Sequence, residues 1–184
     1  MKIDLMRSGS MKGQAMMEYL MTYGLALFVI LIVLAILVAV VLPSLKAPDT
    51  CQFTQPGFTC NQKAHSIVAA DVSNDVRLIF QLDNAQGKSI EVKGVLCTSA
   101  PTGNVDKDDV TPFTAVKQMS AGQSIVFGST GDEVPCYTEG TTTVVKLAPN
   151  SNFKGSLAVV YRFEDDLGPD RLAVATVTGA VQAE

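Results

Sequence analysis

The residues of this chain with the richest chemistry are four cysteines, Cys51, Cys60, Cys97 and Cys136. Their number is even and they include no C-x-x-C pair, so the close Cys or His spacing of a zinc site is missing. We therefore expect two disulfides. Of the three possible pairings we favour Cys51–Cys60, which would close a short loop, with Cys97–Cys136, which would clamp a sheet. Spacing alone leaves the connectivity open.

The single histidine and the acidic clusters lack the partners that catalysis or metal binding requires. His65 stands without the positioned group that orients a general base, so we interpret it as a core or strand-end residue. The acidic clusters within residues 106–109 and 164–166 lack the EF-hand pattern, and we interpret both as solvated turns. The sequence also has no phosphate-binding glycine loop, no G-x-S-x-G and no H-E-x-x-H. We expect no enzymatic activity, no cofactor and no metal.

The elements that must position these residues are of two classes. At 184 residues the chain has room for one globular domain and an accessory segment, and its net charge of −4 argues against general nucleic-acid binding. Much of the apolar content lies in residues 25–42, and no charge occurs between Glu18 and Lys46. As a helix, this uncharged stretch would be about 40 Å long, enough to cross a hydrocarbon core of ~30 Å.

The charges that flank the apolar block predict its orientation. Residues 1–13 contain three basic residues and one Asp, whereas Lys46 after the block is balanced by Asp49. By the positive-inside rule the N-terminus stays in the cytoplasm and the rest of the chain is delivered outside. All four cysteines then lie on the outer, usually oxidising side, which favours disulfides over thiols.

We divide the chain into four segments. Residues 1–13 are a basic leader to be cleaved, and residues 14–42 are a transmembrane or filament-core helix that Pro43 stops. Residues 43–50 are a linker, and residues 51–184 form an extracellular β domain. Because the helix is apolar on every face, lipid or other helices like itself must surround it.

Short β-branched runs separated by turn residues predict the fold of the second half. The clearest strands, 156–163 and 171–178, flank a hairpin turn at 166–170. The other expected strands are 65–72, 76–83, 88–97, 113–119, 124–127 and 141–147. Without helices between them, they predict an antiparallel sandwich or barrel. We expect the α+β class, with a long N-terminal apolar helix followed by an Ig-like antiparallel β-sandwich.

The segment directly before the apolar block carries a family resemblance. It reads KGQAMMEYL at residues 12–20, whereas a secretory signal has its cleavage site after the apolar core, where residues 39–43 offer no convincing A-x-A site. The arrangement resembles the class III signal peptide of archaeal type IV pilin-like proteins over about residues 12–42. Met16 departs mildly from the family, which often has a small residue such as Ser there.

The resemblance implies how the chain is processed and assembled. A prepilin peptidase would recognise Lys12 and Gly13 and cut before Gln14, which becomes the first mature residue. Glu18 and Tyr19 would be the family's Glu-Tyr pair. An acid one turn inside an apolar helix is costly unless paired, and the resemblance offers the new N-terminal amine of Gln14 as its partner.

The resemblance also implies a function. The chain would be a structural subunit that waits in the membrane and then polymerises with like subunits into an extracellular type IV pilus-like filament, for adhesion or surface attachment. Its partners would be the prepilin peptidase, the pilus assembly ATPase and its membrane platform, and not nucleic acid. Two alternatives stay open: a single-span anchor carrying an extracellular binding module, and a minor subunit or pseudopilin that primes assembly.

Overall fold

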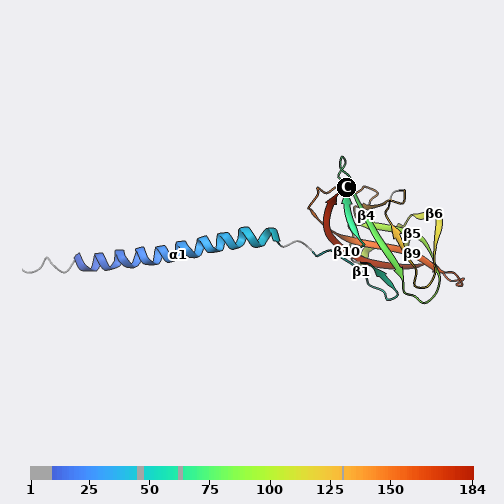
Figure 1. The fold of residues 1–184 in the computed structure, drawn as a ribbon, viewed down its shortest axis with the longest axis horizontal. Coiled ribbons are helices and arrows are strands. Elements are labelled where there is room, and N and C mark those ends of the chain that lie inside the picture. Colours follow the sequence, from blue (N-terminus) through green and yellow to red (C-terminus); the bar gives the residue numbers. More distant parts are fainter. Residues whose placement is uncertain (1–9, 45–47, 62–63, 130) are drawn as a thin grey trace, which may run out of the picture. The chain divides into compact units, whose positions relative to one another are not determined.

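The computed structural model describes all residues except 1–9, 45–47, 62–63 and 130, and in the helix it describes side chains from Met16 to Val41. The chain divides into two compact units, Met1–Leu45 and Lys46–Glu184, which we describe separately (Figure 1). Most of the expected leader lies outside the described residues.

The first unit contains one helix, α1, which runs from Ser10 to Ser44 over 35 residues. It begins before the expected residue 14 and includes Pro43, where we expected it to stop. The fixed φ of proline is itself helical, so Pro43 can occupy the last turn, at the cost of the hydrogen bond to the preceding turn that its missing N–H cannot donate. The expected linker therefore shrinks, because β1 already begins at Thr50.

The second unit is a strand-rich domain whose hydrogen bonding closes on itself. Its strands are β1 Thr50–Phe53, β2 Phe58–Cys60, β3 Ser66–Ala69, β4 Val76–Asn84, β5 Ile90–Thr98, β6 Pro112–Met119, β7 Ser124–Phe127, β8 Val134–Tyr137, β9 Asn152–Phe163 and β10 Arg171–Ala183. Six of them pair in a ring in the order β10, β3, β4, β8, β5, β9 and back to β10. The α+β class is confirmed, but the six-stranded barrel replaces the separate layers of the expected Ig-like sandwich.

Two short seams of parallel strands close the barrel. At one seam, the last residues of β10 pair with β3, with Val181 opposite Ile67. At the other, β8 pairs with β4 on one side and with β5 on the other, where Cys136 lies opposite Cys97. Strand β10 runs parallel to β3, and β5 runs parallel to β8. We expected a purely antiparallel sheet, and the barrel is instead mixed.

The core fills the barrel with side chains from alternating strand positions. Along β4 burial alternates at every residue, as expected for a strand with one face inward. The rings of Phe80 and Phe127 stack with centroids 5.3 Å apart, and Tyr161 meets Phe58 edge to face at 4.7 Å. This arrangement is the usual preference of aromatic pairs in cores.

The loop between β5 and β6 holds more structure than the solvated turn that we expected at residues 106–109. It contains two short 3₁₀ helices, η1 Thr102–Asn104 and η2 Lys107–Asp109. Its Val105 and Val110 pack on Ala158 and Val160 in a second apolar cluster. Because this loop covers the outer face of β9, the middle of that strand is buried on both faces.

Three strands were not expected, and one expected strand is absent. The sequence analysis missed β1, β2 and β8, each of which is only three or four residues long. Residues 141–147 form only isolated bridges, between Val144 and Tyr137 and between Lys146 and Asp75. Here Thr141 donates its hydroxyl to the carbonyl of Thr138 (3.1 Å) and accepts from the amide of Thr143 (3.2 Å). Such local bonds compete with a strand ladder.

Candidate functional site

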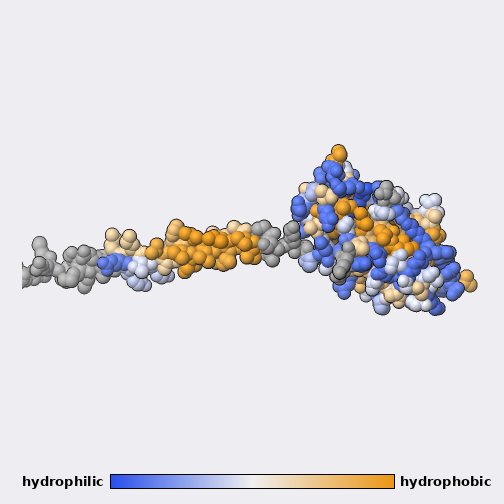
Figure 2. All heavy atoms as spheres, in the orientation of Figure 1, coloured by the Kyte–Doolittle hydropathy of each residue, from blue (hydrophilic) through white to orange (hydrophobic). Residues whose placement is uncertain are grey.

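The surface of α1 is the largest apolar feature of the described chain (Figure 2). Every side chain from Met16 to Val41 is exposed, and twenty of them are large and apolar, with exposed fractions from 43% at Ile32 to 81% at Met21. The helix has no preferred apolar face, and this 26-residue stretch is long and apolar enough to cross a membrane.

The expected assembly residues lie at the start of this apolar stretch. Glu18 is the one charged residue between Met16 and Val41, and its side chain is exposed. The ring of Tyr19 stacks on that of Tyr23, with centroids 6.1 Å apart. The hydroxyl of Thr22 donates to the backbone carbonyl of Glu18 (2.7 Å), one turn earlier in the helix.

The backbone of the expected cleavage residues is part of the same helix. Lys12, Gly13 and Gln14 lie within α1, and their side chains are outside the described part of the chain. Since residues four apart lie on one face of a helix, Gln14 and Glu18 share a face. A new amine at Gln14 would therefore be within one helical turn of the Glu18 carboxylate.

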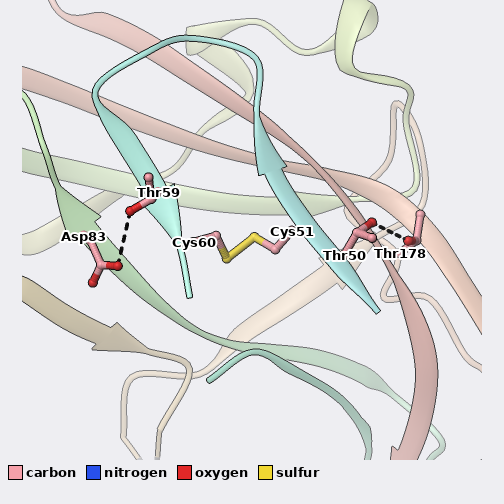
Figure 3. The surroundings of a disulfide bond; sticks show 6 residues. All are labelled: Thr50, Cys51, Thr59, Cys60, Asp83 and Thr178. Atoms are coloured by element: carbon pink, nitrogen blue, oxygen red, sulfur yellow. Dashed lines mark hydrogen bonds between the residues drawn. A yellow bond between two sulfur atoms is a disulfide. The ribbon is translucent and has the colours of Figure 1, made fainter. Parts of the chain in front are cut away.

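Two disulfides cross-link the β domain, with the pairing that the sequence analysis favoured. Cys51 in β1 bonds to Cys60 in β2 over nine residues (Figure 3). Cys97 in β5 bonds to Cys136 in β8 over 39 residues, and these two residues also lie opposite each other in the parallel pair. All four cysteines are buried, which protects both bonds from dissolved thiols.

A network that sequence reasoning missed surrounds the first disulfide. The hydroxyls of Thr50 and Thr178 are 2.7 Å apart (Figure 3). Thr178 also donates to the carbonyl of Pro48 (2.9 Å). The carboxylate of Asp49 accepts from the amide of Ala180 (3.1 Å). No local signal marks Thr178, because its partners are about 130 residues away in the sequence.

The predicted β9–β10 hairpin is present, and its turn is braced by its own charges. Asp166 accepts from the amide of Gly168 (2.8 Å) and from Arg171 (3.0 Å), and these bonds lower the pKa of Asp166. Within the acidic cluster at 164–166, Asp166 therefore stabilises the turn. Leu167 at the tip is fully exposed.

A second ion-pair cluster follows the turn on the side of the barrel. Asp170 accepts hydrogen bonds from Lys93 and from Arg162, both at 2.9 Å. The hydrogen bond from Lys93 is the main cause that lowers the pKa of Asp170, and the charge of Arg162 adds to it. These contacts link the end of the hairpin turn to β5.

Lys117 lies inward on β6, at the edge of the sheet. Its ammonium is 5.6 Å from the ring centre of Phe113 and 4.9 Å from that of Phe127, and it pairs with Asp132. Burial lowers the pKa of Lys117. An inward charge on an edge strand discourages pairing with the edge of another molecule.

A groove of about 890 Å³ with a mixed polar and apolar lining lies between the β5–β6 loop and the loop after β8. Its lining includes Thr141, Thr142 and Thr143 and the acids Asp106 and Asp109. Within the acidic cluster at 106–109, the amide of Asp106 donates to the Asp109 carboxylate (3.0 Å), which caps η2. This contact assigns those two acids a structural role.

His65 precedes β3 and is buried, as expected of a strand-end residue. It is 9% exposed, and neither ring nitrogen has a hydrogen-bond partner among the described residues. A small cavity of about 10 Å³ beside it is lined by Asp49, Ile67 and Gln182.

Comparison of the chain with models of known protein families finds no match, and comparison with curated proteins finds none. The function of the chain is therefore argued from its own residues. The strongest candidate site is the apolar surface of α1 together with Glu18.

Proposed function

We propose that this chain is the precursor of a type IV pilin-like subunit, which is inserted in the membrane, trimmed before Gln14 and polymerised through α1 into an extracellular filament. One observation carries the proposal: the KGQAMMEYL segment and the apolar stretch belong to one continuous helix. A cut before Gln14 would leave the whole stretch from Met16 to Val41 attached to the β domain.

The energetics of the α1 surface support burial among apolar neighbours. Burying one large apolar side chain is worth roughly 1.5–3 kcal/mol, so leaving twenty in water would cost tens of kcal/mol. Lipid and a bundle of identical helices are equally apolar solvents for this surface. Transfer from one to the other would therefore cost little, and packing would decide the outcome.

Glu18 would couple cleavage to assembly. In a bundle away from water, a bare carboxylate costs several kcal/mol unless it meets a cation. The amine of Gln14, on the same subunit or on a neighbour, is a suitable cation, and it exists only after the leader is removed. An uncleaved subunit would lack this partner at the right depth.

The β domain is suited to the outside of the cell. Both disulfides require an oxidising compartment, and the basic leader favours a cytoplasmic N-terminus. In this proposal the domain decorates the filament and supplies its adhesive surface.

The test is to shear filaments from cells that produce the chain, image them by electron microscopy and identify the subunit and its first residue by mass spectrometry. We expect filaments whose subunit begins at Gln14. A protein confined to the membrane with Met1 intact, or one that begins after residue 40, would refute the proposal and favour a membrane-anchored binding module. A trace amount of this chain in filaments built from another protein would identify a minor subunit.

A further inference from the structure

We infer that residues 48–51, with their partners on β10 and β2, form a mechanical clamp that passes tension arriving from α1 into two parts of the barrel at once. We call this group the root clamp. It consists of Pro48, Asp49, Thr50 and Cys51, together with Thr178, Ala180 and Cys60. The inference rests on the proposed function only for the source of the tension, since a filament or a membrane anchor would pull on the domain through residue 48.

The first arm of the clamp is β10. Strand β1 pairs with it antiparallel over four residues, from Thr50 opposite Thr178 to Phe53 opposite Ala175. Thr178 donates its hydroxyl to Pro48, which leaves Thr50 as the donor to Thr178. The Asp49 carboxylate extends the contact beyond the ladder by accepting from the amide of Ala180. Side-chain bonds thus hold the entering chain on β10 in addition to the strand ladder.

The second arm is covalent and leads to β4. The disulfide joins Cys51 to Cys60, and Cys60 lies opposite Leu82 in the pairing of β2 with β4 (Figure 3). Thr59 adds a hydrogen bond from its hydroxyl to the Asp83 carboxylate (3.3 Å). In the ring of strands β3 lies between β10 and β4, so the two arms hold different parts of the barrel.

The direction of β1 makes the first arm resist a lengthwise pull. The start of β1 lies beside Thr178, whereas the hairpin tip with Leu167 lies at the other end of β10. A pull between residue 48 and the tip therefore runs along the strands and loads the β1–β10 hydrogen bonds together, in shear. The same bonds would break one after another if β1 were peeled sideways.

The disulfide limits what is lost when β1 does detach. With the bond intact, the freed chain ends at Cys51, which stays attached to Cys60 with 5.6 Å between the Cα atoms. Without it, the seven to nine residues from Cys51 to β2 could extend by about 20–30 Å, at ~3.3–3.6 Å per residue. The disulfide thus prevents the loop before β2 from extending when β1 detaches under load.

Single-molecule force spectroscopy on the full chain in detergent micelles tests the clamp. One handle holds the N-terminus and the other is attached at the tip through Leu167→p-azidophenylalanine, which is fully exposed and leaves the cysteines untouched. We expect Cys51→Ala with Cys60→Ala to add an early extension step of about 20–30 Å that the oxidised wild type lacks. The matched control, Cys97→Ala with Cys136→Ala, removes the other disulfide and should add no such step.

A second variant keeps both disulfides and tests the β10 arm alone. Its result does not depend on whether the Cys51/Cys60 alanine variant folds correctly. Thr178→Val removes the hydroxyl contacts with little change in shape, and we expect it to lower the force at which β1 detaches. Thr176→Val, two residues earlier on the same face of β10, is the control and should leave that force unchanged. No early step in the Cys51/Cys60 variant, or the same step in the Cys97/Cys136 variant, would overturn the clamp. A lack of filaments in cells would instead refute the proposed function and leave this measurement unaffected.

Discussion

Removing the disulfides one at a time should reveal unequal contributions to the stability of the β domain. A cross-link stabilises mainly by restricting the unfolded chain, and its effect grows with the length of the loop it closes. The two loops span 39 residues for Cys97–Cys136 and nine for Cys51–Cys60. The chain-entropy relation then gives about 4 kcal/mol for the long loop and about 2.6 kcal/mol for the short loop at 25 °C.

Alanine is the right replacement because both pairs are buried. Cys97 and Cys136 have no exposed surface, so serine would bury a hydroxyl and add a cost unrelated to the cross-link. For a domain of this size, roughly 3–5 °C of melting temperature is lost per kcal/mol. We expect decreases of about 12–20 °C for the Cys97/Cys136 pair and about 8–13 °C for the Cys51/Cys60 pair.

The assay is thermal and denaturant unfolding of the full chain in detergent, followed by the near-ultraviolet circular dichroism of tyrosine. The chain has no tryptophan, and Tyr161 is buried in the β domain core, so this signal reports on tertiary packing there. Thiol titration of the wild type should find no free cysteine. Equal losses for the two pairs, or a larger loss for the short loop, would refute the loop-entropy reasoning.

Three further predictions concern processing, assembly and pH. Gly13→Val should leave the leader attached, because a bulky residue blocks the recognition pair, whereas Gly9→Val in the same leader should not; N-terminal mass spectrometry distinguishes them. Glu18→Ala and Glu18→Lys should leave cleavage and insertion intact but lower the filament-to-membrane ratio of the subunit roughly tenfold or more, because an unpaired buried charge costs several kcal/mol. The decrease should be larger for Lys. Unchanged ratios for both variants would exclude the charge pair. Asp170 has a folded-state pKa below its ordinary 3.8, so its stabilisation is present above about pH 4 and is lost as the pH falls through the folded value. Asp170→Asn should therefore lower the melting temperature at pH 7, and this difference from the wild type should shrink as the pH falls below about 4.

Local sequence was sufficient for the features that depend on near neighbours. The apolar run predicted α1 because uninterrupted apolar helix formers leave no other stable arrangement across a membrane, and only its ends moved by two to four residues. The β9–β10 hairpin was predicted from its turn, where Asp166 bonds to Gly168 two residues on. Asn84 stabilises the turn between β4 and β5 by local bonds of the same kind, accepting from the amide of Gln86 and donating to the carbonyl of Lys88.

Part of the candidate site was equally visible in the sequence. Glu18 stands out because it is a single charge at the edge of an apolar run, and Lys12 and Gly13 because they precede that run. The favoured cysteine pairing also matched the structure, although spacing alone could not select it. These features depend on residue type and order, which a linear chain displays directly.

Only the tertiary structure decided how the strands close and what surrounds the entry of the chain. Backbone hydrogen bonds are alike in every strand, so partner choice depends on packing between segments that are far apart in sequence. The tail of β10 joins β3, more than 100 residues earlier, and Thr178 joins Thr50 over 128 residues. Residues 141–147 alternate like a strand, but they form only isolated bridges to Tyr137 and Asp75, and local threonine bonds occupy their first residues.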